Sequence, residues 1–164
     1  MGLEIERKFL VKDNSYRKLA YESVVIEQGY LCREPSRTVR VRILGEHGYL
    51  TIKGVTRGTV REEYEYKIPY VDARQILDMC GDEVLSKRRW YVNYGGKCWE
   101  VDEFLGCLQG LVVAEIELGD ESEEIKLPEF VGEEVTGDAR YYNSMLIGAS
   151  QAPQGFRKVH DGQP

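Results

Sequence analysis

The stretch that decides the fold is Glu4-Ile5-Glu6-Arg7-Lys8 (EIERK), close to the N-terminus. Alternate side chains of a β-strand point to the same face, so Glu4, Glu6 and Lys8 would share one face. Ile5 would lie on the opposite, apolar face. Two carboxylates one step apart on a strand face repel each other. Such a face needs a compensating partner, and the rest of the chain indicates which one.

The same pattern recurs in later strand-like segments, with mainly apolar or aromatic residues on the opposite face. The further like-charged pairs are Arg40/Arg42, Glu63/Glu65, Lys87/Arg89, Glu100/Asp102 and Glu115/Glu117. A single pair of this kind usually marks a solvated face of an amphipathic sheet, which remains the alternative. Ordinary solvated faces, however, mix opposite charges. Six pairs of both signs therefore favour a closed sheet with a charged interior, where carboxylates group for a cation and basic residues for an anion.

Strand signals dominate the chain, and glycine-rich turns separate the segments. Besides the N-terminal segment, strands are predicted over residues 25–31, 37–44, 48–54, 61–69, 85–94, 97–104 and 112–119. Helices are predicted up to Ala20 with Asp13 or Asn14 as cap, over 73–80 with Asp72 as cap, and over 139–149 with Asp138 as cap. We therefore predict an α+β chain, mainly antiparallel β, in which a closed sheet is flanked by a few helices. The apolar outer faces of the strands would be covered by those helices.

Length and composition narrow the class of protein. The 164 residues suit one domain, placed over residues 1–149, with a polar and flexible tail over 150–164. A net charge of −6 argues against binding to a nucleic acid polymer or an anionic membrane. No apolar run is long enough to span a membrane. The four cysteines have no metal-binding spacing, which favours reduced thiols and a cytoplasmic location.

The charged residue types indicate the ligand. Carboxylate pairs without histidine or thiolate suit a hard divalent cation such as Mg²⁺ or Mn²⁺. Several arginines and lysines suit a compact, highly charged oxyanion, because the guanidinium fork binds phosphate oxygens in pairs. A metal and many cations around a polyphosphate are the setting for phosphoryl transfer. The chain has no GxxxxGK[ST] loop, which excludes a P-loop enzyme.

EIERK, followed in order by RVR, IKG, EYE, KRR, WEVDEF and AEIEL, resembles the CYTH superfamily of triphosphate tunnel metalloenzymes, from Met1 to about Ile147. The resemblance implies an eight-stranded antiparallel tunnel that binds a small-molecule triphosphate and a divalent metal. Metal ligation is implied for Glu4, Glu6, Asp102, Glu115 and Glu117. Phosphate contacts are implied for Lys8, Arg40, Arg42, Lys53, Lys87 and Arg89. Glu63, Glu65 and Glu100 match supporting acidic positions.

Members of this superfamily differ in activity. The segment IEQGYL resembles the small bacterial inorganic triphosphatases, in which the tyrosine matching Tyr30 works with the lysine matching Lys8 to activate water. The segment RYYNSML looks like the family's C-terminal helix, which closes one end of the tunnel. We therefore expect metal-dependent hydrolysis of inorganic triphosphate, with release of orthophosphate.

Three alternatives stay open: a thiamine triphosphatase, a class IV-type adenylate cyclase, and a polyphosphate- or nucleotide-binding module without catalysis. Trp90, Tyr91 and Trp99 are candidates for an aromatic clamp on an organic group, although their spacing fits packing better. An outer sheet face left uncovered would suit a second copy, and dimers occur in the family. A homodimer is thus an open alternative to a monomer.

Overall fold

The computed structural model describes residues 2–147 and 153. Its strands are β1 (Gly2–Val11), β2 (Glu22–Glu34), β3 (Arg37–Leu44), β4 (His47–Lys53), β5 (Val60–Ile68), β6 (Val84–Tyr94), β7 (Lys97–Phe104), β8 (Val112–Glu117) and β9 (Val131–Glu134). Its α-helices are α1 (Tyr16–Leu19), α2 (Tyr70–Met79) and α3 (Asn143–Leu146). Two short 3₁₀ turns, η1 (Gly106–Leu108) and η2 (Ala139–Tyr141), complete the described elements.

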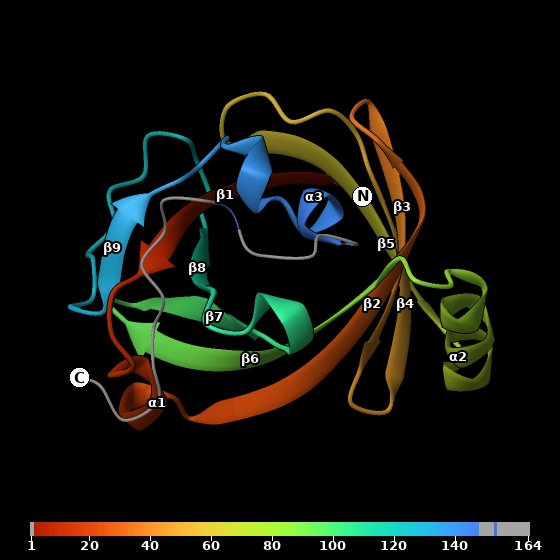
Figure 1. Ribbon diagram of the computed structural model, residues 1–164. Coiled ribbons are helices and arrows are strands. Elements are labelled where there is room, and N and C mark those ends of the chain that lie inside the picture. Colours follow the sequence, from red (N-terminus) through yellow and green to blue (C-terminus); the bar gives the residue numbers. More distant parts are fainter. Residues whose placement is uncertain (1, 148–152, 154–164) are drawn as a thin grey trace.

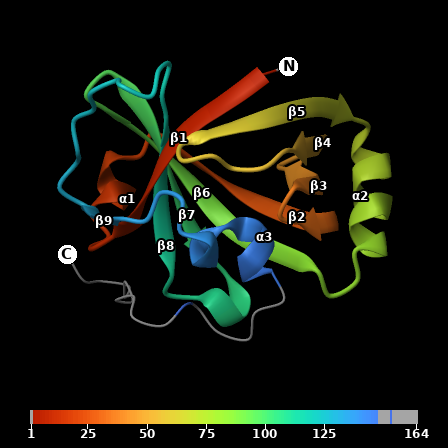
Figure 2. The same cartoon turned by 90° about the horizontal axis from the view of Figure 1, so that it is seen from above.

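The strands form one antiparallel sheet that closes on itself (Figures 1 and 2). Its order is β5-β4-β3-β2-β6-β7-β8-β1-β9, and an additional pairing joins β5 to β1. Strands β1 to β8 therefore make the closed eight-stranded barrel that the sequence predicts. Strand β1 has three neighbours, since it pairs with β8, with β5 over Gly2–Ile5, and with β9 at Phe9 and Val11.

Strand β9 was not predicted. Its sequence, VGEE, is only four residues long and carries a glycine and two adjacent glutamates, so it lacks the alternation of a half-buried strand. It pairs with β1 beyond the point where β5 separates from β1. The pairing partner, and not local sequence preference, makes this segment a strand.

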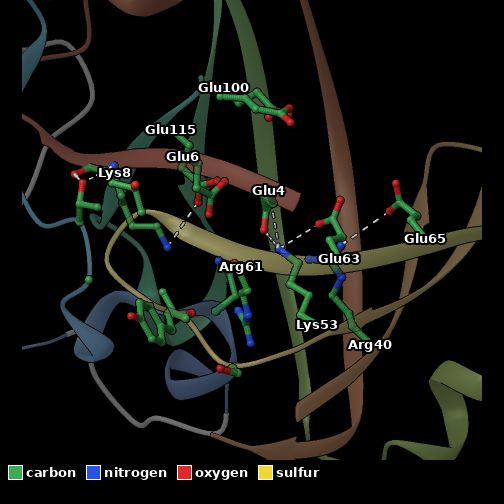
Figure 3. A pocket seen from close by; sticks show the side chains of 18 of the residues that line it. Glu4, Glu6, Lys8, Arg40, Lys53, Arg61, Glu63, Glu65, Glu100 and Glu115 are labelled. Carbon is green, nitrogen blue, oxygen red and sulfur yellow. Dashed lines mark hydrogen bonds and ion pairs between the residues drawn. The ribbon is translucent and has the colours of Figure 1, made fainter. Parts of the chain in front are cut away.

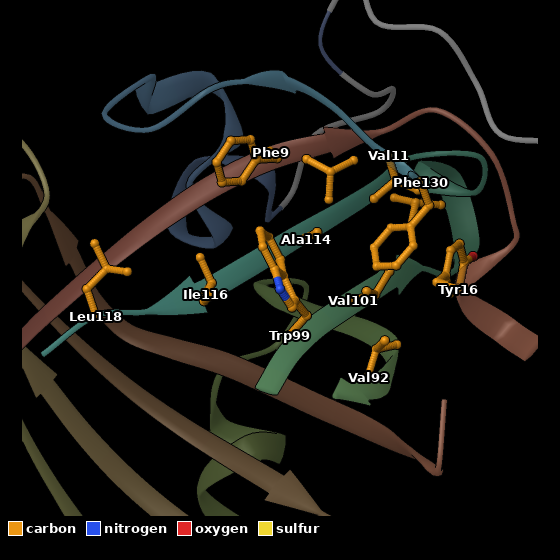
Figure 4. Packing of buried hydrophobic residues seen from close by; sticks show 12 residues of the cluster. Phe9, Val11, Tyr16, Val92, Trp99, Val101, Ala114, Ile116, Leu118 and Phe130 are labelled. Atoms are coloured by element: carbon orange, nitrogen blue, oxygen red, sulfur yellow. The ribbon is translucent and has the colours of Figure 1, made fainter. Parts of the chain in front are cut away.

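The outward faces of the strands carry the main hydrophobic cores (Figure 4). On one side, Phe9 and Trp99 lie with ring centroids 5.6 Å apart, and Tyr16 of α1 packs on Phe130. On the other side, α2 lies outside β2, β3 and β4 (Figures 1 and 2). A Cβ on Gly48 of β4 would come within 2.5 Å of the Cβ of Ala73 in α2, so the contact requires glycine. These cores confirm the predicted outward-facing apolar sides.

One end of the barrel interior is apolar, next to the charged part that the sequence predicts. Leu85, Phe104 and Val113 share the inward face with the charged residues of their own strands, yet they are 5%, 2% and 1% exposed. The C-terminal residues Tyr141 and Leu146 pack against this apolar cluster. In Figure 1, α3 lies within the outline of the barrel. The C-terminal segment thus closes this end, as the resemblance implied.

Two of the predicted helix caps are wrong. Helix α1 begins after Ser15, and Asp13 accepts hydrogen bonds from the backbone and the hydroxyl of Ser15 at 2.9 and 2.6 Å. Helix α2 begins after Pro69, which places Asp72 in its first turn. Proline favours the start of a helix because its missing N–H would lack an intrahelical partner there.

The predicted C-terminal helix over 139–149 is broken. Asp138 does cap the segment, accepting from the backbone of Arg140 at 3.1 Å, but η2 ends before α3 starts at Asn143. Residues 148 and 149, and the predicted tail over 150–164 apart from Pro153, lie outside the described residues. Among the helices of the described part, none has the length and apolar character needed to cross a membrane.

Candidate functional site

The barrel encloses a cavity of about 220 Å³, lined by inward-facing side chains (Figure 3). The predicted site residues that line it are Glu4, Glu6, Lys8, Tyr30, Arg40, Arg42, Lys53, Glu63, Glu65, Lys87, Arg89, Glu100, Glu115 and Glu117. Asp102 lies just behind this lining and is 1% exposed. The alternation read from the sequence therefore brings these residues together in one place.

The charges are sorted onto two walls. Glu4 and Glu6 of β1 and Glu115 and Glu117 of β8 form an acidic wall. A basic wall comes from β3 and β6, which flank β2; β2 lies opposite β1 in the closed sheet order. Among the described residues, the lining holds seven acidic and seven basic side chains. The lining is thus balanced in total charge, with four carboxylates on β1 and β8 and four cations on β3 and β6.

The basic wall is anchored by Asp102. Arg89 donates from Nε to Asp102 Oδ1 at 2.8 Å and from Nη2 to Asp102 Oδ2 at 2.9 Å. Lys87 Nζ lies 2.6 Å from Asp102 Oδ2. Burial alone would raise the pKa of Asp102, but Arg89 and Lys87 hold it well below its usual range. Burial lowers the pKa of Lys87 to about 8. The carboxylate of Asp102 acts to raise this pKa, and the positive charge of Arg89 acts to lower it. In this arrangement both oxygens of Asp102 are engaged, so its ligation of a metal stays a prediction.

The arginines of β3 have unmet hydrogen-bonding capacity. Arg42 donates to Glu65 at 3.0 Å, and Arg40 donates to Thr51 at 3.2 Å. The Nε atoms of both arginines are buried without a partner in the described part of the chain. Burial and the nearby charges of Arg40 and Arg89 lower the pKa of Arg42 to about 10. Buried cationic donors without partners are costly, and an oxyanion in the cavity would satisfy them.

On the acidic wall, some carboxylates are paired and others are not (Figure 3). Lys53 Nζ lies 2.9 and 3.1 Å from the two oxygens of Glu4 and 3.2 Å from Glu63. Lys8 Nζ lies 3.4 Å from Glu115 and 3.2 Å from the carbonyl oxygen of Tyr141, to which it donates. Burial would lower the pKa of Lys8, but the carboxylates around it raise the pKa, so Lys8 is an ammonium at neutral pH.

Among the described residues, Glu6 and Glu117 are the carboxyl groups of this wall that have no ion pair. They stand directly opposite each other in the β1–β8 register, and neither has an ion pair within the described part of the structure. Burial and the charges of Glu115 and Glu4 raise the pKa of Glu6 well above its usual value. Burial and Glu4 also raise the pKa of Glu117. The wall holds more negative charge than its own cations neutralise.

The donor set fits a hard cation. In residues 2–147, no three carboxylate, imidazole or thiolate groups converge into a complete metal site as they stand. Mg²⁺ is commonly bound through one or two carboxylates and retains several water ligands, so a converged set of three is not required. Carboxylate oxygens without nitrogen or sulfur donors select Mg²⁺ or Mn²⁺ over softer metals.

Several residues that line the cavity were not predicted from the sequence. Arg61 has the same parity as Glu63 and Glu65, so that pattern contained the signal; its Nε donates to the Gly54 carbonyl at 2.7 Å. The other missed residues come from loops and the C-terminal segment, where no periodicity exists: Thr56, Gly58, Thr59, Thr136, Gly137, Tyr142, Asn143 and Ser144.

The candidate aromatic clamp does not line the cavity. Trp99 is fully buried in the outer core, and Trp90 lies against Tyr16 with ring centroids 6.2 Å apart. Tyr91 lies beside Tyr21 at 6.2 Å. Among the described residues, the aromatic side chains of the lining are Tyr30 and Tyr142.

Fold and cavity together define a β-tunnel protein with facing acidic and basic walls. The family model described as CYTH domain matches residues 2–143, and the chain belongs to this family.

The chain is also similar to named relatives. It is 49% identical to an inorganic triphosphatase of Acetivibrio thermocellus, covering 90% of this chain and 94% of the relative. It is 33% identical to an inorganic triphosphatase of Nitrosomonas europaea, covering 87% and 95%. A crystal structure of an inorganic triphosphatase superposes with a TM-score of 0.63 at 30% identity, over 93% of this chain and 99% of that one.

Proposed function

We propose that this protein hydrolyses inorganic triphosphate with the help of a divalent metal, releasing orthophosphate. The observation that carries the proposal is the pair of facing acidic and basic walls in a cavity of about 220 Å³. Pockets for drug-sized ligands usually span about 300–1,000 Å³, so this one suits a compact inorganic anion better than a nucleotide. The relatives named inorganic triphosphatase support the same substrate.

In this proposal each wall has its own task. Arg40, Arg42, Lys87 and Arg89 bind and orient the phosphate oxygens, with Lys8 and Lys53 beside them. The family is metal-dependent in general; here Glu4, Glu6, Glu115 and Glu117 would hold Mg²⁺ or Mn²⁺, joined by Asp102 if it releases a cation. When bound, the metal neutralises charge on the phosphate oxygens as it develops. Glu63, Glu65 and Glu100 hold the basic side chains in place through ion pairs.

The reaction itself needs little covalent chemistry from the protein. A water oxygen attacks the terminal phosphorus, the bridging P–O bond breaks, and orthophosphate and pyrophosphate are the products. Lys8, as an ammonium in the metal-free cavity, is placed to stabilise negative charge on the phosphate oxygens. We assign Tyr30, whose side chain lines the cavity, to positioning the attacking water beside Lys8.

The test is orthophosphate release from inorganic triphosphate, thiamine triphosphate and ATP, each with Mg²⁺, Mn²⁺ or EDTA. Turnover of inorganic triphosphate that EDTA abolishes is the expected result. Equal turnover of the organic substrates would contradict the size argument. Triphosphate binding without any release would instead identify a binding module.

We also propose a cytoplasmic location, which the four free cysteines support. The homodimer stays a prediction, with Leu3, Ile52 and Tyr66 among the exposed apolar side chains of the outer barrel surface.

A further inference from the structure

Asn143 lies at the boundary between the charged cavity and its apolar closed end. It is the first residue of α3 and lines the cavity together with Tyr142 and Ser144. Lys87 Nζ donates to Asn143 Oδ1 at 3.0 Å, and Gln28 Nε2 donates to the same oxygen at 3.4 Å. An uncharged side chain from the C-terminal segment is therefore inserted into the basic wall.

These two contacts fix the orientation of the Asn143 amide. Lysine has only donors, so the amide oxygen must face Lys87. The amide nitrogen then points away from Lys87 and Gln28. Within the described part of the chain, no hydrogen bond from Asn143 Nδ2 is found, and this atom is not among the buried atoms that lack a partner. The two N–H donors of the amide are therefore accessible from the cavity.

The position of Asn143 is held from both sides of α3. On the C-terminal side, Arg33 of β2 donates to the carbonyls of Ser144 and Ile147 at 3.1 and 3.3 Å. On the N-terminal side, the carbonyl of Tyr141 accepts from Lys8, whose ammonium lies 5.6 Å from the ring centroid of Tyr142. A four-residue helix that is tied at both ends presents its amide in one defined place.

We propose that Asn143 is a substrate-binding residue whose side-chain amide donates hydrogen bonds to the terminal phosphoryl group at the closed end of the tunnel. The inference rests on the proposed function, because it takes an inorganic triphosphate as the ligand. Beside Asn143, Lys87 supplies charge to the same group. The Asn143 amide adds N–H donors with a fixed direction at this position. An unesterified phosphate end presents free oxygens to these donors. An ester group in the same place would instead meet the apolar cluster of Leu85, Phe104 and Val113.

Two substitutions separate substrate binding from positioning. Asn143→Asp keeps an oxygen for Lys87 and Gln28 but replaces the two donors by an acceptor and adds a negative charge that also repels triphosphate. Asn143→Leu removes both functions at similar size. Met145→Ala, on an exposed side chain of the same helix, is the control for helix integrity. We measure KM and kcat for inorganic triphosphate with Mg²⁺, and the rise in melting temperature that triphosphate produces with and without Mg²⁺.

If Asn143 binds substrate, both Asn143 variants weaken triphosphate binding by about 10- to 100-fold, the effect of losing a hydrogen bond to a charged group, while Met145→Ala does not. If Asn143 only positions Lys87, Asn143→Leu adds no further weakening in a Lys87→Met background, and the inference is overturned. The melting-temperature shift does not depend on turnover, so the inference can hold even if the wild type binds triphosphate without hydrolysing it. No shift for the wild type would overturn it.

Discussion

Glu6→Gln should make the metal-free protein more stable and at the same time inactivate it. Glu6 stands directly opposite Glu117, is half-buried, and has no ion pair within the described structure. Glutamine keeps the size and the hydrogen-bonding shape but removes one negative charge from the acidic wall. Stability of the metal-free protein and turnover change in opposite directions for one reason. Repulsion between carboxylates destabilises the acidic wall when no metal is bound, and the same carboxylates are needed to bind the metal.

The size of the stability effect follows from the register. Like charges directly opposite on neighbouring strands cost roughly 0.2–1 kcal/mol. For a chain of this length, removing that repulsion raises the melting temperature by up to about 4 °C. A bound metal at 100 times its Kd adds about 2.7 kcal/mol to the wild type, or about 5–10 °C. The variant should lose most of this metal-induced shift.

The assay combines thermal unfolding in EDTA and in Mg²⁺ with orthophosphate release from inorganic triphosphate. Turnover should fall at least about 100-fold, since Lewis-acid stabilisation is worth several kcal/mol. Glu62→Gln, an exposed glutamate on the outer face of β5, is the matched control and should change neither quantity. A Glu6 variant that melts lower in EDTA and keeps its turnover would refute the assignment of an overcharged acidic wall.

Three further outcomes test other parts of the structure. Arg89→Ala should reduce turnover by about 100-fold or more. Arg88 faces outward and donates to a serine hydroxyl at 3.1 Å, so Arg88→Ala should change turnover by no more than about 2-fold. Equal losses of turnover would show that the strand register is wrong. Gly48→Ala should lower stability by about 1–3 kcal/mol through overpacking against α2, measured by urea unfolding, with KM unchanged. Burial and a hydrogen bond to a carboxylate raise the pKa of Tyr16, so its contribution to stability is present below about pH 10 and is lost above it. Compared with Tyr16→Phe at pH 8 and pH 11, the wild type should therefore lose more stability on going to the higher pH; parallel losses would contradict this.

The alternation of side chains along single strands was enough to predict the lining of the cavity. Glu4, Glu6, Arg40 and Arg42 point inward because side-chain direction in a strand has a period of two and needs no knowledge of the partner strand. Arg61 follows the same rule, so its place in the lining could also have been predicted from the sequence. The closed sheet was also predicted, since six charged faces need an enclosed space, whereas its eight strands followed from the resemblance to the family.

The remaining features depend on contacts between distant parts of the chain. Strand β9 exists because β1 offers it a free edge, and no local pattern announces that edge. The predicted caps failed because α1 begins only after Ser15, beyond Asp13 and Asn14, and α2 begins already after Pro69, ahead of Asp72. Asn143 has no charge and no periodic neighbour, so only the three-dimensional path of the C-terminal segment brings it to Lys87.

The three pairings of β1 have a consequence for how the molecule is made. Strand β1 precedes the other described strands in the chain but pairs with β8 and β9, so Glu6 meets Glu117 only after more than 100 further residues have been synthesised. At a synthesis rate of about 5–20 residues per second, β8 becomes available to β1 on the order of 5–20 s after β1 has been made. Contacts this distant in sequence fold slowly. The barrel therefore closes late in folding. In a chain that ends before β8, the edge of β1 that normally pairs with β8 would have no partner strand.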